Sequence, residues 1–311
     1  MEHFASILKT MGHTGRLRIL ALLERGELTV TELVQILNLS QPRVTQYINS
    51  LESVGIIERL REGSWVFSRL KRGNSDGARL VDVILKNIPR HDDVFKSDLI
   101  ELQKVRDARS KVAEEFFAKV ALDDKQLGNE YLPQRDIEIA LLERIAEQSF
   151  EFMIDMGTGT GRMLELFASQ IQHGAGIDLS PEMLKVARHK LAGDEFAHIS
   201  VQQGKLQSTP FKDGTADLIT LHQVLHFLDD PSEAIAEAAR VMRHKATLLI
   251  IDFEAHSVES FRDEYAHRRL GFSDAEIIEW SESVGLKIQN TQRVINTNNP
   301  AVVIWEAQKL S

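Results

Sequence analysis

Apolar and polar positions at the start of the chain recur at helical spacing. Apolar residues three and four positions apart predict short helices that end near Gly26. Thr29 is expected to cap a further helix over Val30–Leu37, because Glu32 stands three residues later, as a capping box requires. A short turn at residues 38–39 is expected to end this helix and to lead directly into another.

The next helix is expected to open at Ser40, with Pro42 in its first turn, and to close at Gly55. Two short β-prone runs follow, Ile56–Leu60 and Ser64–Leu70, and the turn-forming residues between them indicate a hairpin. Two short helices joined by a tight turn and followed by a hairpin predict a winged helix-turn-helix.

The middle of the chain is strongly charged and helical in its spacing. Three helices are expected there, over Ala78–Ile88, Lys96–Val120 and Ile137–Glu147. The apolar positions of the long second helix leave two alternatives open. The segment either packs over the domain that follows or forms a dimer interface.

From Phe150 onward, strand and helix patterns alternate. The expected strands are Phe152–Met156, Gly174–Asp178, His198–Val201, Asp217–Leu221 and Thr247–Phe253. The expected helices between some of them are Arg162–Gln172, Pro181–Ala192 and Ser232–Met242. This alternation predicts an α/β fold with a parallel sheet and crossover helices.

The end of the chain breaks the alternation. A helix is expected to begin after Ser273, with Glu276 completing a second capping box, and two strands follow it without a helix between them. These strands, Leu286–Val294 and Ala301–Ala307, are joined by the turn-prone run Asn296–Pro300. They are therefore expected to pair antiparallel.

The length of the chain and the distribution of its charge indicate how it divides into domains. At about 100–200 residues per domain, 311 residues suggest two domains, and the patterns place them at 1–75 and 148–311 with a connector at 76–147. Residues 1–72 hold ten Lys and Arg against seven Asp and Glu, a balance of +3. The rest hold 27 against 39, a balance of −12, which gives the net charge of −9. A basic head on an acidic body is typical of a DNA-binding module fused to a small-molecule domain.

The chain contains no cysteine, which excludes disulfides, thiolate metal sites and a cysteine nucleophile. It opens with no secretory leader pattern and holds no apolar run of 18 residues. The expected location is therefore the cytoplasm, with no membrane partner.

The strongest chemical signal is the glycine-rich run Asp155–Gly161, which follows an expected strand and opens an expected helix. At such a junction, free backbone N–H groups meet the polar groups of a nucleotide, and glycines let the backbone approach without a Cβ. Asp178 ends the next expected strand, where its carboxylate can accept hydrogen bonds from ribose hydroxyls. A dinucleotide fingerprint would need glycine at the position of Arg162, so a dinucleotide is not favoured.

The glycine spacing with an acid two residues ahead resembles motif I of class I S-adenosyl-L-methionine-dependent methyltransferases. The resemblance extends over about residues 150–308 and implies a Rossmann-like sheet with S-adenosyl-L-methionine as cofactor. One departure is Lys205 after Gly204, where many members carry aspartate. The implied cofactor-binding residues are Asp155, Gly157, Thr158, Gly159, Gly161, Asp178, Leu179, Met183, Leu206 and His222.

The head, over residues 12–70, resembles the ArsR-type winged-helix repressors, which implies binding to an operator in double-stranded DNA by a homodimer. The polar residues of the second helix and wing that can reach phosphates and base edges are Ser40, Gln41, Arg43, Thr45, Gln46, Tyr47 and Arg61. Arg59 and Arg69 flank the hairpin together with Arg61 and are expected to grip the phosphate backbone of DNA. The alternative is a winged helix that binds protein and has a solvated basic face. Absence of thiols argues against sensing of soft metals and against arsenite methylation.

The sequence signal for a catalytic base is weaker than the signals for cofactor and DNA binding. His222 and His226 follow an expected strand four residues apart and suit removal of a proton from a methyl acceptor. They equally suit a polar pocket lining, and a metal pair would need a third ligand. Further candidates beyond the last parallel strand are Asp252, Glu254, His256, Tyr265, His267 and Arg268.

Three functions remain open from the sequence. The first is a DNA-binding regulator with a working methyltransferase domain for a small-molecule acceptor. The second is a repressor that senses S-adenosyl-L-methionine or its demethylated product without turnover. The third is an enzyme whose winged helix serves only dimerisation.

Overall fold

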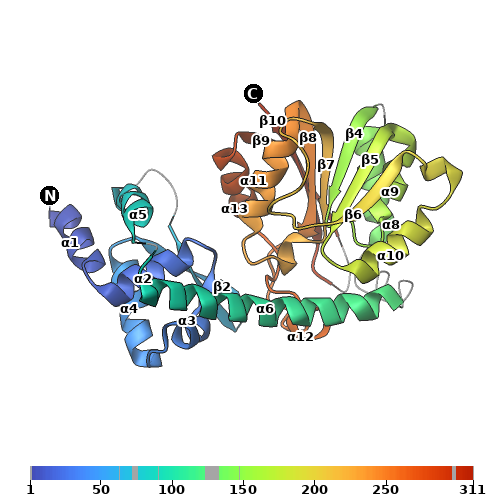
Figure 1. Ribbon diagram of the computed structural model, residues 1–311. Helices are drawn as coiled ribbons and strands as arrows, with labels where there is room; N and C mark the ends of the chain where they lie inside the picture. Colours follow the sequence, from blue (N-terminus) through green and yellow to red (C-terminus); the bar gives the residue numbers. More distant parts are fainter. Residues whose placement is uncertain are drawn as a thin grey trace. The chain divides into compact units, whose positions relative to one another are not determined.

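The computed structural model describes residues 2–62, 64–71, 76–89, 91–122, 133–146, 148–295 and 299–310 (Figure 1). The chain divides into two compact units, Met1–Lys111 and Val112–Ser311. The division falls inside one helix, α6 (Asp93–Leu122). The residues predicted as a single connector, 76–147, are therefore shared between the two units.

The first unit is a helical domain with a small sheet. Its elements before α6 are α1 (Glu2–Met11), α2 (Thr14–Leu23), β1 (Leu28–Thr29), α3 (Val30–Leu37), α4 (Gln41–Ser53), β2 (Ile57–Glu62), β3 (Trp65–Leu70) and α5 (Asp76–Asn87). The sheet order is β1-β3-β2, and both pairings are antiparallel. The predicted hairpin is confirmed, whereas the two-residue strand β1 was not predicted.

The capping box at α3 is confirmed. The hydroxyl of Thr29 accepts the N–H of Glu32 at 3.3 Å, and the Glu32 carboxylate accepts the N–H of Thr29 at 2.8 Å. Ser40 occupies the N-cap of α4 as predicted, but its side chain makes no capping hydrogen bond there. The start of α4 is therefore fixed by Pro42 and by backbone contacts.

The first half of α6 belongs to the core of the first unit. Phe95, Leu102 and Val105 are at most 6% exposed and join the apolar cluster formed by α1 to α4. Beside them, Arg18 in α2 donates two hydrogen bonds to the nearly buried carboxylate of Asp98, at 2.7 and 2.6 Å. This half of the helix therefore contributes to the core of the winged domain. In the second half, the ring of Phe117 lies 4.8 Å from that of Phe227, as expected for a segment that packs over the following domain. A dimer interface on this segment stays a prediction.

The second unit is built on a seven-stranded sheet in the order β6-β5-β4-β7-β8-β10-β9 (Figure 1). The strands are β4 (Phe150–Met156), β5 (Ile171–Asp178), β6 (Ile199–Gln203), β7 (Ala216–His222), β8 (Met242–Phe253), β9 (Leu286–Val294) and β10 (Val302–Lys309). The first five pair in parallel, and β10 runs antiparallel to both β8 and β9. The predicted parallel sheet with an antiparallel terminal pair is confirmed.

Helix α8 (Gln134–Ile145) precedes the first of these strands. The helices that lie between strands are α9 (Arg162–Phe167), η1 (Ala168–Gln170), α10 (Pro181–Lys190), η2 (Asp194–Phe196), η3 (Leu225–Phe227), α11 (Pro231–Val241), α12 (Ser260–Tyr265) and α13 (Asp274–Ser283). The second capping box, Ser273 with Glu276, is confirmed at α13.

One expectation in this unit was wrong in detail, and one helix was missed. The helix predicted over 162–172 ends at Phe167, because Ile171 already pairs with Phe150 in the sheet. Helix α12 was not predicted. Residues 296–298 of the predicted turn lie outside the described residues. Among the described ranges, no helix is both long and apolar enough to cross a membrane.

The Arg18–Asp98 pair gives a test of the role of α6. Asp98 is 2% exposed, and the neighbouring carboxylate raises the pKa of Arg18. Asp98→Ala leaves the guanidinium without its acidic partner, so we expect the opening free energy of α2 and α3 amides to fall by about 3 kcal/mol in hydrogen exchange.

The matched control is Asp93→Ala in the same helix, where an exposed aspartate pairs with Lys96 at 3.3 Å. We expect a loss of less than about 1 kcal/mol there. Equal effects of the two substitutions would contradict a packing role for the first half of α6.

Candidate functional site

The glycine turn after β4 has the backbone geometry that the sequence predicts. Gly157, Gly159 and Gly161 adopt φ values of +82°, +51° and +84°, in the region that favours glycine. A Cβ on Gly157 would lie 2.5 Å from Val224, whereas a Cβ on Gly159 would meet nothing within 4 Å. The turn is thus packed against the protein at Gly157 and open at Gly159.

Asp178, at the end of β5, holds this turn in place. One of its carboxylate oxygens accepts the N–H of Gly159 at 2.9 Å, and the other accepts the N–H of Ser180 at 2.8 Å. Burial raises the pKa of Asp178. Of the predicted residues that follow it, Leu179 is 48% exposed and Met183 is buried.

Asp155 lies below the turn, inside the sheet. It is 1% exposed and accepts the hydroxyl hydrogen of Thr220 at 2.6 Å. Burial raises the pKa of Asp155 to about 6. Thr158 is also buried, and its side chain fills the space beside Gly176. These two predicted residues support the turn from within.

The remaining predicted cofactor residues come from the neighbouring strand ends. Leu206 is buried, while Lys205, where the resemblance implied aspartate, is exposed. His222 ends β7 half-buried, and its buried Nε2 has no hydrogen-bond partner. Burial lowers the pKa of His222 to about 4, so its imidazole is neutral at pH 7.

Gln223, which directly follows β7, was not predicted as a site residue. It adopts φ +53°, which is rare for a residue with a Cβ, while its N–H donates to the carbonyl of Ile251. Both polar atoms of its side-chain amide are buried without a partner. Strained backbone and free polar atoms together mark this position beside His222 as part of the site.

The residues present fit a nucleoside ligand such as the adenosyl group. An open glycine position, a carboxylate at the end of the adjacent strand and the unpartnered nitrogen of His222 provide a cradle and polar contacts. Within the described residues, no group of three or more His, Cys, Asp or Glu is arranged to hold a metal ion.

The second candidate base is buried more deeply. His226 is fully buried, and its Nδ1 lies 2.6 Å from the Asp252 carboxylate. Its ring stacks on His267 with centroids 3.8 Å apart. Two of the other candidates are held in ion pairs: Glu254 pairs with Arg293, and Arg268 pairs with Asp229. The structure thus brings His226, Asp252 and His267 together, and the ring of Tyr265 lies 6.3 Å from that of His267.

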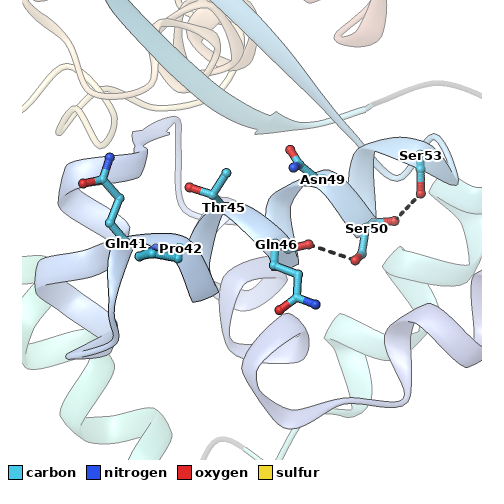
Figure 2. A pocket seen from close by; sticks show the side chains of 7 residues that line it. All are labelled: Gln41, Pro42, Thr45, Gln46, Asn49, Ser50 and Ser53. Atoms are coloured by element: carbon cyan, nitrogen blue, oxygen red, sulfur yellow. Dashed lines mark hydrogen bonds between the residues drawn. The ribbon is translucent and has the colours of Figure 1, made fainter.

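The first unit presents a separate candidate site on α4. Figure 2 shows polar side chains projecting from this helix around a surface pocket. Its lining residues are Gln41, Pro42, Thr45, Gln46, Asn49, Ser50 and Ser53. Asn49, Ser50 and Ser53 extend the predicted polar face by a further two turns of the helix.

Tyr47 differs from its neighbours on α4. It is 6% exposed, and its ring lies so close to Gly15 that a Cβ there would be 2.5 Å away. Its hydroxyl accepts a hydrogen bond from Nε of the exposed Arg43 at 2.8 Å. The structure thus makes Tyr47 a core residue that positions Arg43. Two residues not predicted from the sequence border the same surface hollow as Arg43: His13, the N-cap residue of α2, and Arg16 within α2.

The arginines of the hairpin are not equivalent. Arg61 is exposed, as an approach to DNA requires. Arg59 pairs with Glu52 at 3.3 Å. Arg69 is engaged by Glu58 and Glu27, at 2.7 and 3.4 Å. The expectation that Arg69 grips a phosphate is therefore replaced by a role in bracing the hairpin.

Two segments of the chain match known families. Residues 13–59 match the bacterial regulatory proteins of the arsR family. Residues 154–250 match a methyltransferase domain. The first match contains all of α4, and the second begins in β4 and ends in β8.

Curated relatives resemble part of the second unit. The uncharacterized methyltransferase YcgJ of Bacillus subtilis (strain 168) is 30% identical over 119 residues, which are 38% of this chain and 47% of that protein. The malonyl-acyl-carrier protein O-methyltransferase of Serratia marcescens is 27% identical over 169 residues, 54% of this chain and 60% of that protein. The chain spans about half the length of the curated relatives it matches.

Solved structures share the fold. The N-methyltransferase NodS from Bradyrhizobium japonicum WM9, in complex with S-adenosyl-L-homocysteine, superimposes with a TM-score of 0.54 at 15% identity, covering 64% of this chain and 99% of that chain. The cyclase SpnF gives 0.50 at 16% identity, covering 59% of this chain and 84% of that chain. Likeness at this identity concerns the fold alone.

The open glycine position gives a direct test of the cradle. In Gly159→Ala the added methyl group would occupy the space where the adenosyl group is expected, so affinity for S-adenosyl-L-homocysteine should fall at least about tenfold in calorimetry. The cost in stability is about 1–2 kcal/mol from the left-handed backbone.

Gly214→Ala is the matched control, because Gly214 has φ +64° and a Cβ there would likewise meet nothing within 4 Å. It carries the same backbone strain away from the turn, and we expect unchanged affinity. Unchanged binding by Gly159→Ala would show that the ligand does not lie on this turn.

Proposed function

We propose that this chain, which joins an arsR-family helix-turn-helix segment to an S-adenosyl-L-methionine-dependent methyltransferase domain, is a DNA-binding transcriptional regulator that methylates a small molecule. The observation that carries this proposal is the presence of two separate polar sites, the face of α4 and the glycine turn after β4, each within its matched segment. We further propose that it acts in the cytoplasm as a homodimer.

The DNA-binding part rests on the residues of α4. Gln41, Gln46 and Asn49 are exposed amides, which pair with base edges in a major groove. Arg43 adds a positive charge that Tyr47 holds at the start of the helix. Arg61 on β2 supplies a second cation for the phosphate backbone. Amides on the helix and arginines beside it are the combination that DNA readout requires.

The cofactor part rests on the turn and its carboxylate. Gly159, the open position of the turn, would let the adenosyl group lie on the backbone. Asp178 would accept hydrogen bonds from the ribose hydroxyls. Leu206 would offer its backbone to the adenine ring. When bound, S-adenosyl-L-methionine supplies an electrophilic methyl group. His222, neutral and with a free Nε2, would face the cofactor site from the end of β7.

The second candidate function is a repressor that uses S-adenosyl-L-methionine or its product only as an effector. The complete burial of His226, the second candidate base, favours this alternative. In that case, ligand would bind two DNA-binding states with different affinity and no methyl group would be transferred.

One experiment distinguishes these functions. The full chain is titrated into fluorescent duplex DNA from the region upstream of its own gene, with and without S-adenosyl-L-homocysteine, and release of that product from S-adenosyl-L-methionine is followed with candidate acceptors. Binding to DNA with product release supports the regulator enzyme. Binding that shifts with ligand but gives no product supports the sensor, and absence of DNA binding contradicts both.

The Arg43–Tyr47 contact predicts a graded loss of DNA affinity. Arg43→Ala removes a cation and should weaken binding about tenfold in anisotropy at low salt, with a smaller slope of affinity against salt concentration. Tyr47→Phe keeps the buried ring but removes the hydroxyl that accepts from Arg43, so we expect a smaller loss in the same direction.

Arg188→Ala is the control, because it removes a solvent-accessible arginine from α10 of the second unit. DNA affinity should not change in that variant. If Arg43→Ala behaves like Arg188→Ala, the assignment of α4 to the DNA groove fails.

A further inference from the structure

Unpartnered imidazole nitrogens gather beyond the carboxyl ends of β7 and β8. Nε2 of His226, Nε2 of His256 and both ring nitrogens of His267 are buried without a hydrogen-bond partner. A buried polar atom left unsatisfied costs free energy, and native proteins hold few of them. Several such atoms in one cluster indicate a place where a ligand supplies the missing hydrogen bonds.

The rings of this histidine cluster (His226, His256 and His267) are packed together with phenylalanines. His226 stacks on His267 with 19° between the ring planes, and Phe253 lies 5.7 and 5.4 Å from the two centroids. Phe261 lies 5.0 Å from His256 and 5.2 Å from His267. The free nitrogens therefore lie in largely apolar surroundings.

The charged groups around the cluster are already engaged within the protein. Asp252 accepts from His226 Nδ1 and from the N–H groups of Leu225 and Phe253, at 2.6, 3.1 and 2.8 Å. Arg268 pairs with Asp229, and Arg262 pairs with Glu259. Both guanidinium groups therefore already have acidic partners within the protein.

The imidazoles of His256 and His267 are neutral at pH 7. Burial lowers the pKa of His256 to about 4 and that of His267 well below its ordinary value. A neutral imidazole offers one acceptor and one donor, so it suits a hydroxyl group better than an ammonium or a carboxylate.

Flat aromatic side chains border the cluster. Phe227 lies 4.1 Å from His226 and 5.4 Å from His267, and Tyr265 lies 6.3 Å from His267, measured between ring centroids. Phe227 and Tyr265 are only half-buried. Phe116 of α6 makes edge contact with Tyr265 at 6.4 Å. Rings in such positions favour an aromatic ligand through offset and edge-to-face contacts.

We infer that the histidine cluster binds the methyl acceptor, and that this acceptor is an uncharged ring compound bearing a hydroxyl group. His256 and His267 hydrogen-bond the hydroxyl, and His226, fixed by Asp252, is a positioning residue that holds His267 through ring stacking. This inference rests on the proposed methyltransferase function and names the substrate class of that site.

The same geometry disfavours a metal ion. Nitrogen lone pairs lie in the plane of each imidazole ring, and the planes of His226 and His267 are stacked nearly parallel. Two such lone pairs do not converge on one ion.

The test is a binding experiment on the full chain with histidine-labelled protein. The probe is para-cresol, and its matched controls are para-methylanisole, para-toluate and para-methylbenzylamine, which replace the free hydroxyl by an ether, an anion and a cation. We expect para-cresol to shift the imidazole NMR signals of His256 and His267 and to bind about tenfold more tightly than each control.

Variants separate the roles within the cluster. His267→Phe preserves the stacked ring and removes both free nitrogens, and His256→Asn tests the third member of the cluster; each should weaken para-cresol binding several-fold. Asp252→Asn should change the tautomer signal of His226, which a merely space-filling role would not do. His173→Asn, at an exposed histidine of β5, is the control and should change nothing.

Calorimetry with S-adenosyl-L-homocysteine distinguishes failure of the acceptor site from failure of the proposed function. If that ligand binds while para-cresol gives no shift, or while the ionised fragments bind equally well, the inference is wrong and the proposed function stands. If that ligand does not bind, the proposed function fails. If one equivalent of Zn²⁺ alone shifts the NMR signals of all three imidazoles, the cluster is a metal site and the inferred acceptor site is wrong.

Discussion

The carboxylate of Asp178 is the constraint on which the ligand site depends. By accepting the N–H groups of Gly159 and Ser180, it ties the turn after β4 to the end of β5 and to the start of α10. On the other side, Gly157 lies against Val224, so the same turn fixes the loop after β7. The glycine turn, its acid and the histidine-bearing loop are therefore one packed unit rather than three independent motifs.

Sequence reasoning succeeded where the determinants are local. The capping boxes at α3 and α13 depend on residues three positions apart, and the glycine turn depends on backbone conformations that only glycine adopts readily. The parallel sheet and the antiparallel terminal pair followed from the alternation of elements along the chain. The residues that determine these features lie close together in the sequence, which is why the features could be predicted.

The wrong predictions and the missed contact all involve residues that are far apart in the sequence. Tyr47 counts as a polar residue of an exposed helix until Gly15, 32 positions earlier, brings another helix against its ring. Arg69 counts as a phosphate-binding cation in the sequence pattern, whereas in the structure it pairs with Glu27 at 3.4 Å. The contact between His226 and His267 likewise joins residues 41 positions apart. Contacts of this kind depend on tertiary packing, for which a single sequence carries no periodic signal.

The division of the chain also limits how the two sites can influence one another. Each unit has its own buried core, and the boundary lies within α6. A ligand on the glycine turn can change DNA affinity only if it binds two states of the chain with different free energies. By linkage, DNA must then change the affinity for that ligand by the same factor. The coupling can therefore be measured from either site, and disagreement between the two directions would show that one of the binding events had been misassigned.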